Sequence, residues 1–177
     1  MTKVIMGIGI PGSGKSTVLK KFSEKNGYLY ICPDDIRAEL TGDAGDQSKN
    51  REVWAAAYGR TSAALKDNQT IVFDATFANQ NQRRDFISFA KENGADKIQG
   101  VYLDVPLSVA TERNIGRERQ VPDYAMERMD KNLRDFPPEL ADGIDTLVIL
   151  NEDGELSELK LSEKEGEIHR EFGRSAK

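Results

Sequence analysis

The sequence predicts an α/β fold: a parallel five-stranded sheet with helices on both faces. The first reason is a set of short apolar runs that are nearly continuous, as in strands covered on both faces. They occupy residues 4–10, 28–32, 70–75, 98–105 and 145–150. The second reason is that longer helical patterns separate these runs. Parallel neighbours need a crossover connection, which is usually a helix.

Helical patterns fill the intervals between the apolar runs. They cover residues 15–25, 34–41, 49–66, 79–93, 106–115 and 122–134. Turn residues mark several of their ends: Asn93 and Gly94 suit a C-cap, and Pro122 suits the first turn of a helix. In the pattern at 49–66, Trp54 and Tyr58 share the apolar face, so we expect them in the core rather than against a base.

The chain has 177 residues, which suits one domain with a sizeable core. We expect residues 1–150 to form this domain, with residues 151–177 as an acidic C-terminal extension of it. Within the extension, residues 154–161 are a candidate edge strand and residues 162–172 a candidate terminal helix.

The formal net charge is −5, which argues against a general, nonspecific binder of nucleic acid. A polyanionic partner would have to meet a local basic patch. The single cysteine, Cys32, excludes an internal disulfide. No apolar run approaches the ~18 residues of a membrane span. We therefore expect a soluble, cytoplasmic protein without a membrane partner.

Residues 7–17 read GIGIPGSGKST and match the pattern G-x-x-x-x-G-K-[ST] between a strand and a helix. Glycines let successive backbone N–H groups line an anion-binding concavity, and the following helix adds its positive end. The pattern predicts a P-loop that binds ATP through Gly12, Ser13, Gly14, Lys15, Ser16 and Thr17. Lys15 would reach the β- and γ-phosphates, and Ser16 would coordinate Mg²⁺. The alternative is a glycine-rich turn that binds nothing.

The second apolar run ends in CPDDIR, with two aspartates and an arginine. Ligands of open α/β sheets lie beyond the carboxyl ends of the strands, so a carboxylate here would face the phosphate loop. Asp34 or Asp35 could accept the proton of an attacking hydroxyl, and Arg37 could bind a phosphate on the acceptor. Equally, one aspartate could cap the next helix and Arg37 could be a solvated surface charge.

The third run, TIVFDAT, places Asp74 at the end of an apolar strand. The position suits a carboxylate that helps to hold Mg²⁺ through water or that orients Arg37, and an acid at this depth needs a partner. Thr76 and Asn79 are candidates for the acceptor groove, although Asp74 or Thr76 could instead cap the next helix. Arg83 and Arg84 on that helix are expected to be surface charges.

Residues 106–134 contain Arg113, Arg117 and Arg119 around a glycine. A helix–loop–helix with arginines can close as a lid over a phosphoryl group, where positive charge stabilises the transition state. We expect Arg117 to be the main lid contact with the nucleotide and Arg113 the second. The alternative is an ordinary charged helix surface, because acidic residues are interleaved with the arginines.

Together, the stretches IGIPGSGKST, PDDIR, DAT, LDVP and ERNIGRERQVP resemble the 5′-hydroxyl kinase domain of bacteriophage polynucleotide kinase and its bacterial relatives. The likeness covers about residues 3–134. Many P-loop enzymes share the first stretch, whereas the second and fifth at this spacing are more particular. The resemblance implies that Lys15 and Ser16 act on ATP and Mg²⁺, and that Asp34 is the general base.

The same resemblance assigns the remaining site residues. It implies that Arg37 contacts the acceptor's phosphate, that Asp74 supports the acceptor site, and that Arg117 is the lid clamp. The family often has a basic or small residue before its acid pair. Here Pro33 stands in that place, which could change how the acceptor is held.

These features predict an ATP-dependent phosphotransferase that moves the γ-phosphoryl group onto the 5′-hydroxyl end of DNA or RNA. No phosphatase or ligase module is recognised, so a part in nucleic-acid repair would be the kinase step only. One alternative is a P-loop kinase of a small molecule, such as a nucleoside, sugar or antibiotic, which the acidic net charge favours. Another is a nucleotide-dependent regulatory switch, in which Asp34 would only cap a helix.

Overall fold

The computed structural model describes residues 1–166 and contains one six-stranded sheet in the order β2-β3-β1-β4-β5-β6. The strands are Lys3–Ile8 (β1), Leu29–Ile31 (β2), Ile71–Asp74 (β3), Lys97–Leu103 (β4), Thr146–Leu150 (β5) and Leu156–Leu161 (β6). The first five run parallel, and β6 pairs with β5 in the antiparallel sense. The predicted α/β fold with five parallel strands is confirmed.

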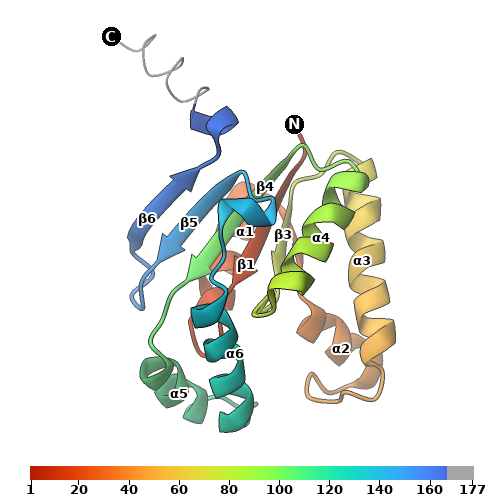
Figure 1. Ribbon diagram of the computed structural model, residues 1–177. Helices are drawn as coiled ribbons and strands as arrows, with labels where there is room; N and C mark the ends of the chain where they lie inside the picture. Colours follow the sequence, from red (N-terminus) through yellow and green to blue (C-terminus); the bar gives the residue numbers. More distant parts are fainter. Residues whose placement is uncertain (167–177) are drawn as a thin grey trace.

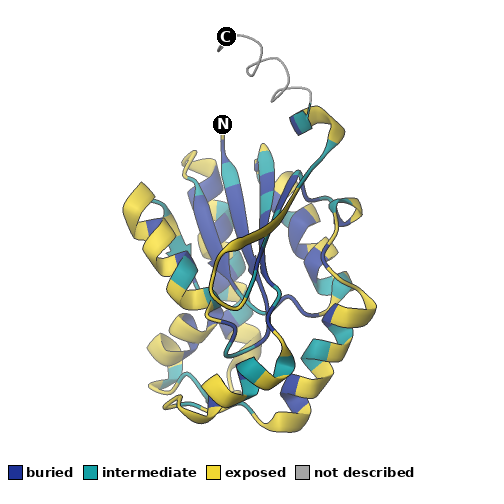
Figure 2. Ribbon diagram, turned by 90° about the vertical axis from the view of Figure 1, so that its left-hand side faces the viewer, coloured by how far each residue is buried: buried dark blue, intermediate teal, exposed yellow. Residues whose placement is uncertain are grey.

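Six α-helices and one 3₁₀-helix connect the described strands. They are Lys15–Asn26 (α1), Pro33–Thr41 (α2), Asn50–Lys66 (α3), Gln80–Glu92 (α4), Leu107–Ile115 (α5), Asp123–Asp135 (α6) and Leu140–Asp142 (η1). Each predicted helix between the strands is present, with ends that shift by one residue at most. Helices lie on either side of the sheet when it is viewed from its β6 edge (Figure 2). None of the helices in residues 1–166 is long and apolar enough to cross a membrane.

The core lies around β1, the central strand of the parallel part. Val4 stands opposite Ile71 of β3 on one side and Ile98 of β4 on the other, and all three are fully buried. Strands covered on both faces need apolar residues at consecutive positions, which explains the continuous runs in the sequence. The parallel strands all end toward the side where α2, α5 and α6 lie (Figure 1).

The aromatic residues of α3 pack against this core. Trp54 stacks on Phe73 at 6.3 Å between ring centroids, and Tyr58 meets Phe86 edge-on at 5.7 Å. Both are partly buried against the core, as expected. Trp54 has a second role as well, because it lines the cleft described below.

The C-terminal extension continues the same sheet. The expected edge strand at 154–161 is confirmed as β6, whose exposed Leu156 and Leu159 face solvent. A helical turn begins at residue 163, and Lys97 pairs with Glu165 at 2.5 Å. The rest of the candidate helix at 162–172 lies outside the described residues.

One expectation about the surface is wrong. Arg83 is completely buried and ion-pairs with Asp142, at 3.1 Å from Nε to Oδ2. Its Nη atoms donate to the carbonyl oxygens of Phe77 and Phe136, at 2.9 and 2.7 Å. Arg84 is half-exposed and also donates to Asp142. The guanidinium therefore joins three chain segments, and a local helical pattern carries no trace of such distant partners.

We predict that Asp142→Ala lowers the free energy of unfolding by about 3–5 kcal/mol, because it leaves the buried Arg83 guanidinium without its counter-charge. Denaturant-induced unfolding measures the change. The matched control is Asp135→Ala, which removes an exposed i,i+4 pair with Lys131 and should cost under about 0.5 kcal/mol. Equal losses in the two variants would contradict a special role for the buried pair.

Candidate active site

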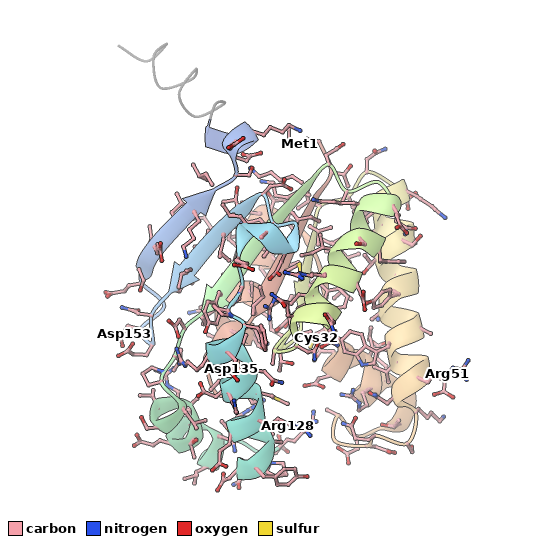
Figure 3. The ribbon with its side chains drawn as sticks, viewed as in Figure 1. Met1, Cys32, Arg51, Arg128, Asp135 and Asp153 are labelled. Atoms are coloured by element: carbon pink, nitrogen blue, oxygen red, sulfur yellow. The ribbon has the colours of Figure 1, made fainter. Side chains whose placement is uncertain are left out.

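A cleft of about 900 Å³ opens at the carboxyl ends of β1, β2 and β3, and residues of α5, α6 and the loop between them also line it. It is lined by all the residues predicted for the site: Gly12, Ser13, Gly14, Lys15, Ser16, Thr17, Asp34, Arg37, Asp74, Thr76, Arg113 and Arg117. Cys32 and Arg128, both labelled in Figure 3, line it from the end of β2 and from α6. Segments far apart in the chain thus meet in one concave site.

The loop between β1 and α1 is held by main-chain contacts on both sides. Gly9 N donates to the carbonyl oxygen of Thr76 at 3.1 Å, which ties the loop to the end of β3. Gly12 and Gly14 have φ angles of 81° and 86°, in the left-handed region that favours glycine. A Cβ on Gly12 would lie 2.3 Å from the carbonyl oxygen of Ala110, so a side chain there would collide with α5.

The donors at this loop fit a bound phosphate group. Among the described residues no side chain caps the N-terminus of α1, and the N–H groups of a helix's first turn have no partner within the helix. The hydroxyl of Ser13 is buried and has no hydrogen-bond partner among the described residues. Lys15 and the exposed Ser16 stand at the start of the helix. Unpaired donors, a cation and a hydroxyl are a suitable set for a polyphosphate with its divalent cation.

A charged cluster joins the phosphate loop to the sheet. Lys15 Nζ and the Tyr30 hydroxyl each donate to a different carboxylate oxygen of the buried Asp74. Burial alone would raise the pKa of Asp74, but the charge of Lys15 and hydrogen bonds from Lys15, Ser16 and Tyr30 outweigh it and lower this pKa. Burial and the neighbouring Asp74 raise the pKa of Tyr30. Asp74 therefore stays ionised and Tyr30 stays protonated near neutral pH.

Asp34 lies at the start of α2 and carries two arginine contacts. Arg37 Nη1, one turn along the helix, donates to Asp34 Oδ1. Arg119 Nη1, from the loop between α5 and α6, lies 3.3 Å from Asp34 Oδ2. The Asp34 side chain keeps about half of its surface exposed, at 52%. Its carboxylate is thus reachable from the cleft and its charge is balanced in this state.

Arg37 is buried and serves the local structure. Its Nη2 donates to Asn50 Oδ1 at 2.9 Å, and its Nη1 also approaches the carbonyl oxygen of Ala44 at 3.4 Å. Only Nε lacks a partner among the described residues. The guanidinium therefore holds Asp34, the 42–50 loop and the start of α3 together. The alternative that Arg37 is a solvated surface charge is wrong, because its side chain is only 5% exposed.

The helices α5 and α6 bring further arginines over the cleft. Arg113 donates to the carbonyl oxygens of Ser13, at 3.4 Å, and Glu152, at 2.7 Å. Arg117 is exposed, and its guanidinium has no hydrogen-bond or ion-pair partner among residues 1–166. The buried Asn114 side chain bonds both the N–H and the C=O of Val121, so it closes the loop that carries Arg117.

Two further details differ from the sequence-based expectations or add to them. Asn79 does not line the cleft. Its side chain caps α4 by accepting from Gln82 N at 3.0 Å. Tyr30, Trp54 and Arg128 were not predicted as part of the site, although Tyr30 holds Asp74 and the other two line the cleft. Tyr30 was detectable in principle, since it lies within the second strand, four residues before Asp34. The position of Arg128 depends on how α6 packs.

A glycine loop between the central strand and a helix, a lysine at its end and an arginine-bearing helical pair define the P-loop nucleotide-binding class. The chain belongs to the AAA domain family, whose model matches residues 4–136.

Three curated relatives are kinases by name. The L-seryl-tRNA(Sec) kinase of Methanococcus maripaludis is 27% identical over 172 residues, which is 86% of this chain and 65% of the relative. A protein of Acanthamoeba polyphaga mimivirus that is named as a bifunctional polynucleotide phosphatase/kinase is 28% identical, over 63% of this chain and 23% of that protein. The adenylyl-sulfate kinase of Aeromonas salmonicida is 29% identical, over 63% of this chain and 58% of the relative. The chain thus spans less than two thirds of the length of each.

Among solved structures, a chain of the Pnkp1/Rnl/Hen1 RNA repair complex superposes with a TM-score of 0.69 and 21% identity. The match covers 76% of this chain and 44% of the other. At this level of identity the likeness establishes a shared fold. The fold of this chain is therefore that of the P-loop kinases.

We predict that Gly12→Ala weakens nucleotide binding at least tenfold, because the added methyl group meets the Ala110 carbonyl and the φ of 81° strains any side chain. Equilibrium binding of a fluorescent ATP analogue measures this. The control is Gly59→Ala in the exposed interior of α3, where a Cβ meets nothing within 4 Å. That control should bind normally and gain about 0.5–1 kcal/mol of stability. Unchanged nucleotide binding by the Gly12 variant would contradict a role of the loop in close approach.

The lowered pKa of Asp74 predicts a pH-dependent contribution to stability. The contribution is fully present above the unfolded-state pKa of about 3.9 and is lost as the pH falls through the lower folded-state pKa. The free energy of unfolding should therefore differ between the wild type and Asp74→Asn by a constant amount from pH 7 to about pH 5, and the difference should narrow below about pH 4. A difference that stays constant down to pH 3 would show that Asp74 gains nothing from Lys15 and Tyr30.

Proposed function

We propose that the protein is a kinase that transfers the γ-phosphoryl group of ATP to the 5′-hydroxyl end of a nucleic acid. The observation that carries the proposal is that Asp34 and the phosphate loop line the same cleft. A half-exposed carboxylate across from a phosphate site suits a general base for an attacking hydroxyl. The volume of about 900 Å³ is near the upper end of ligand pockets, at roughly 1,000 Å³, so a nucleotide and an acceptor end fit together.

The charge of the cleft favours an anionic acceptor. Its basic lining residues are Lys15, Arg37, Arg113, Arg117, Arg119 and Arg128, and its acidic ones are Asp34 and Asp74. The chain as a whole has a net charge of −5. A positive cleft in a negative protein concentrates anionic ligands at one place without binding polyanions elsewhere.

On the donor side, the backbone from Gly12 to Thr17 would hold the phosphates of ATP, and Ser16 would hold Mg²⁺. Bound Mg²⁺ would supply positive charge to the phosphate oxygens. Lys15 and the exposed guanidinium of Arg117 would stabilise the charge that develops on the transferred group, and Arg113 would support the loop through its hydrogen bond to the Ser13 carbonyl oxygen.

On the acceptor side, Asp34 would orient the hydroxyl and accept its proton. The new bond joins the hydroxyl oxygen to the γ-phosphorus, the bond from that phosphorus to the bridging oxygen breaks, and its electron pair leaves with ADP. Arg37 holds Asp34 in place, while Asp74 and Thr76 shape the floor of the cleft. Positioning of the two substrates supplies most of the rate enhancement in such a transfer, because its transition state is loose.

The relatives support a nucleic-acid acceptor without deciding it. Two of the three are named for tRNA or polynucleotide substrates. The third is named for adenylyl sulfate, a small molecule, and it favours a second candidate function: a kinase of a small phosphorylated or sulfated acceptor.

The acceptor is tested by offering γ-labelled ATP with a 5′-hydroxyl oligodeoxynucleotide, an oligoribonucleotide, nucleosides, sugars and adenylyl sulfate. Label on an oligonucleotide supports the proposal. Label on a small molecule alone supports the second candidate. ATP binding without transfer to any acceptor would indicate a nucleotide-dependent switch and would overturn the proposal.

We predict that Asp34→Ala lowers the rate of transfer by at least a hundredfold and leaves the affinity for ATP unchanged, because it removes the proton acceptor and not the phosphate loop. Single-turnover transfer and ATP titration measure the two effects. The control is Asp35→Ala, the next residue, which does not line the cleft and pairs only loosely with Lys20 at 3.7 Å. It should retain the wild-type rate. A fully active Asp34 variant would disprove the assignment of the base.

A further inference from the structure

Two arginines meet at Asp34, and they differ in what they are able to do. The Arg37 side chain is 5% exposed and already bonds Asp34, Asn50 and the Ala44 carbonyl. The Arg119 side chain is 35% exposed, and its ion pair with Asp34 is the only hydrogen bond or salt bridge of its guanidinium among residues 1–166. Within the described part of the chain, releasing Arg37 would break three polar contacts, whereas releasing Arg119 would break one.

Arg119 also stands at the mouth of the acceptor side. Its Nε lies 3.6 Å from the place where a Cβ on Gly45 would be, so the guanidinium sits between Asp34 and the 42–50 loop. It reaches this place from the loop between α5 and α6, the region that we expect to act as a lid. A ligand approaching Asp34 from this side therefore meets Arg119.

We propose that Arg119 is the residue that recognises a phosphate on the acceptor, and that it exchanges Asp34 for this phosphate when the acceptor binds. The inference rests on the proposed function and assigns to Arg119 the contact that the family resemblance gives to Arg37. In the free protein Arg119 neutralises the Asp34 carboxylate. With a phosphate-bearing acceptor in place, Arg119 pairs with the phosphate, and one oxygen of Asp34 becomes available to the attacking hydroxyl.

The chemistry of the two partners supports this exchange. A guanidinium can bind two oxygens of a phosphate through two parallel hydrogen bonds, whereas Asp34 offers Arg119 a single oxygen. Arg37 remains on the other carboxylate oxygen and keeps Asp34 oriented. Arg37 is thus a positioning residue, and Arg119 determines which acceptors enter.

The test uses a nucleoside and its 3′-monophosphate, two 5′-hydroxyl compounds that differ only in the phosphate. The chain contains one tryptophan, Trp54, and it lines the cleft, so its fluorescence reports binding without any need for turnover. Transfer from labelled ATP to the same two compounds is measured in parallel. The variants are Arg119→Ala, Arg119→Lys and, as a control, Arg51→Ala. Arg51 is exposed at the start of α3, does not line the cleft and is labelled in Figure 3.

We expect the wild type to prefer the 3′-monophosphate, and Arg119→Ala to reduce this preference at least tenfold by weakening the monophosphate alone. Affinity for ATP and for the nucleoside should not change. Arg119→Lys, which keeps the charge, should recover part of the preference, and Arg51→Ala should behave as the wild type.

Three results would overturn the inference: equal binding of the two compounds by the wild type, an equal loss for both in Arg119→Ala, or a lysine variant no better than alanine. Each of these results would disprove the role of Arg119 even if the protein phosphorylated oligonucleotides. Conversely, a preference that depends on Arg119 without any transfer of label would retain the phosphate contact and disprove the kinase proposal.

Discussion

The buried ion pair between Lys15 and Asp74 is the interaction on which the cleft depends. It joins the first turn of α1 to the end of β3, and the contact between Gly9 N and the Thr76 carbonyl closes the same junction through the main chain. A buried pair of this kind adds little net stability, because removing two charges from water is costly. The pair instead fixes the geometry of the site. It holds the Lys15 ammonium beside the phosphate loop and fixes the end of β3 against the start of α1. The loop, the aspartate and the floor of the cleft are therefore positioned together.

Much of the fold could be predicted because its signals are local. Strands buried on both faces need continuous apolar residues, so the runs in the sequence were visible without any knowledge of their neighbours. The phosphate loop was equally visible, since its glycines are required by the backbone angles at Gly12 and Gly14. The edge strand β6 was a weaker prediction, because its residues are largely exposed and its pairing with β5 supplies what the pattern does not.

The parts that escaped prediction depend on partners far away in the chain. Arg83 looks like any charged residue of a helix, and only Asp142, 59 positions later, explains its burial. Arg37 lines the cleft, but its burial by bonds to the 42–50 loop and Asn50 could not be seen in the local pattern. The same holds for the charge of the cleft. Arginines from α2, α5, α6 and the loop before α6 gather around one opening, although the chain carries a net charge of −5. Composition averages over the surface, whereas topology decides where the cations converge.

The two hydrogen bonds between the Asn114 side chain and the main chain of Val121 restrict how the intervening loop can move. They make a ring of the intervening residues, so the segment that carries Arg117 and Arg119 cannot extend or flatten independently of α5. Any opening movement must then pivot outside this ring rather than within it. With the proposed roles of Arg117 at the nucleotide and Arg119 at the acceptor, the two guanidinium groups would move together, and the binding of one substrate would be coupled to the binding of the other.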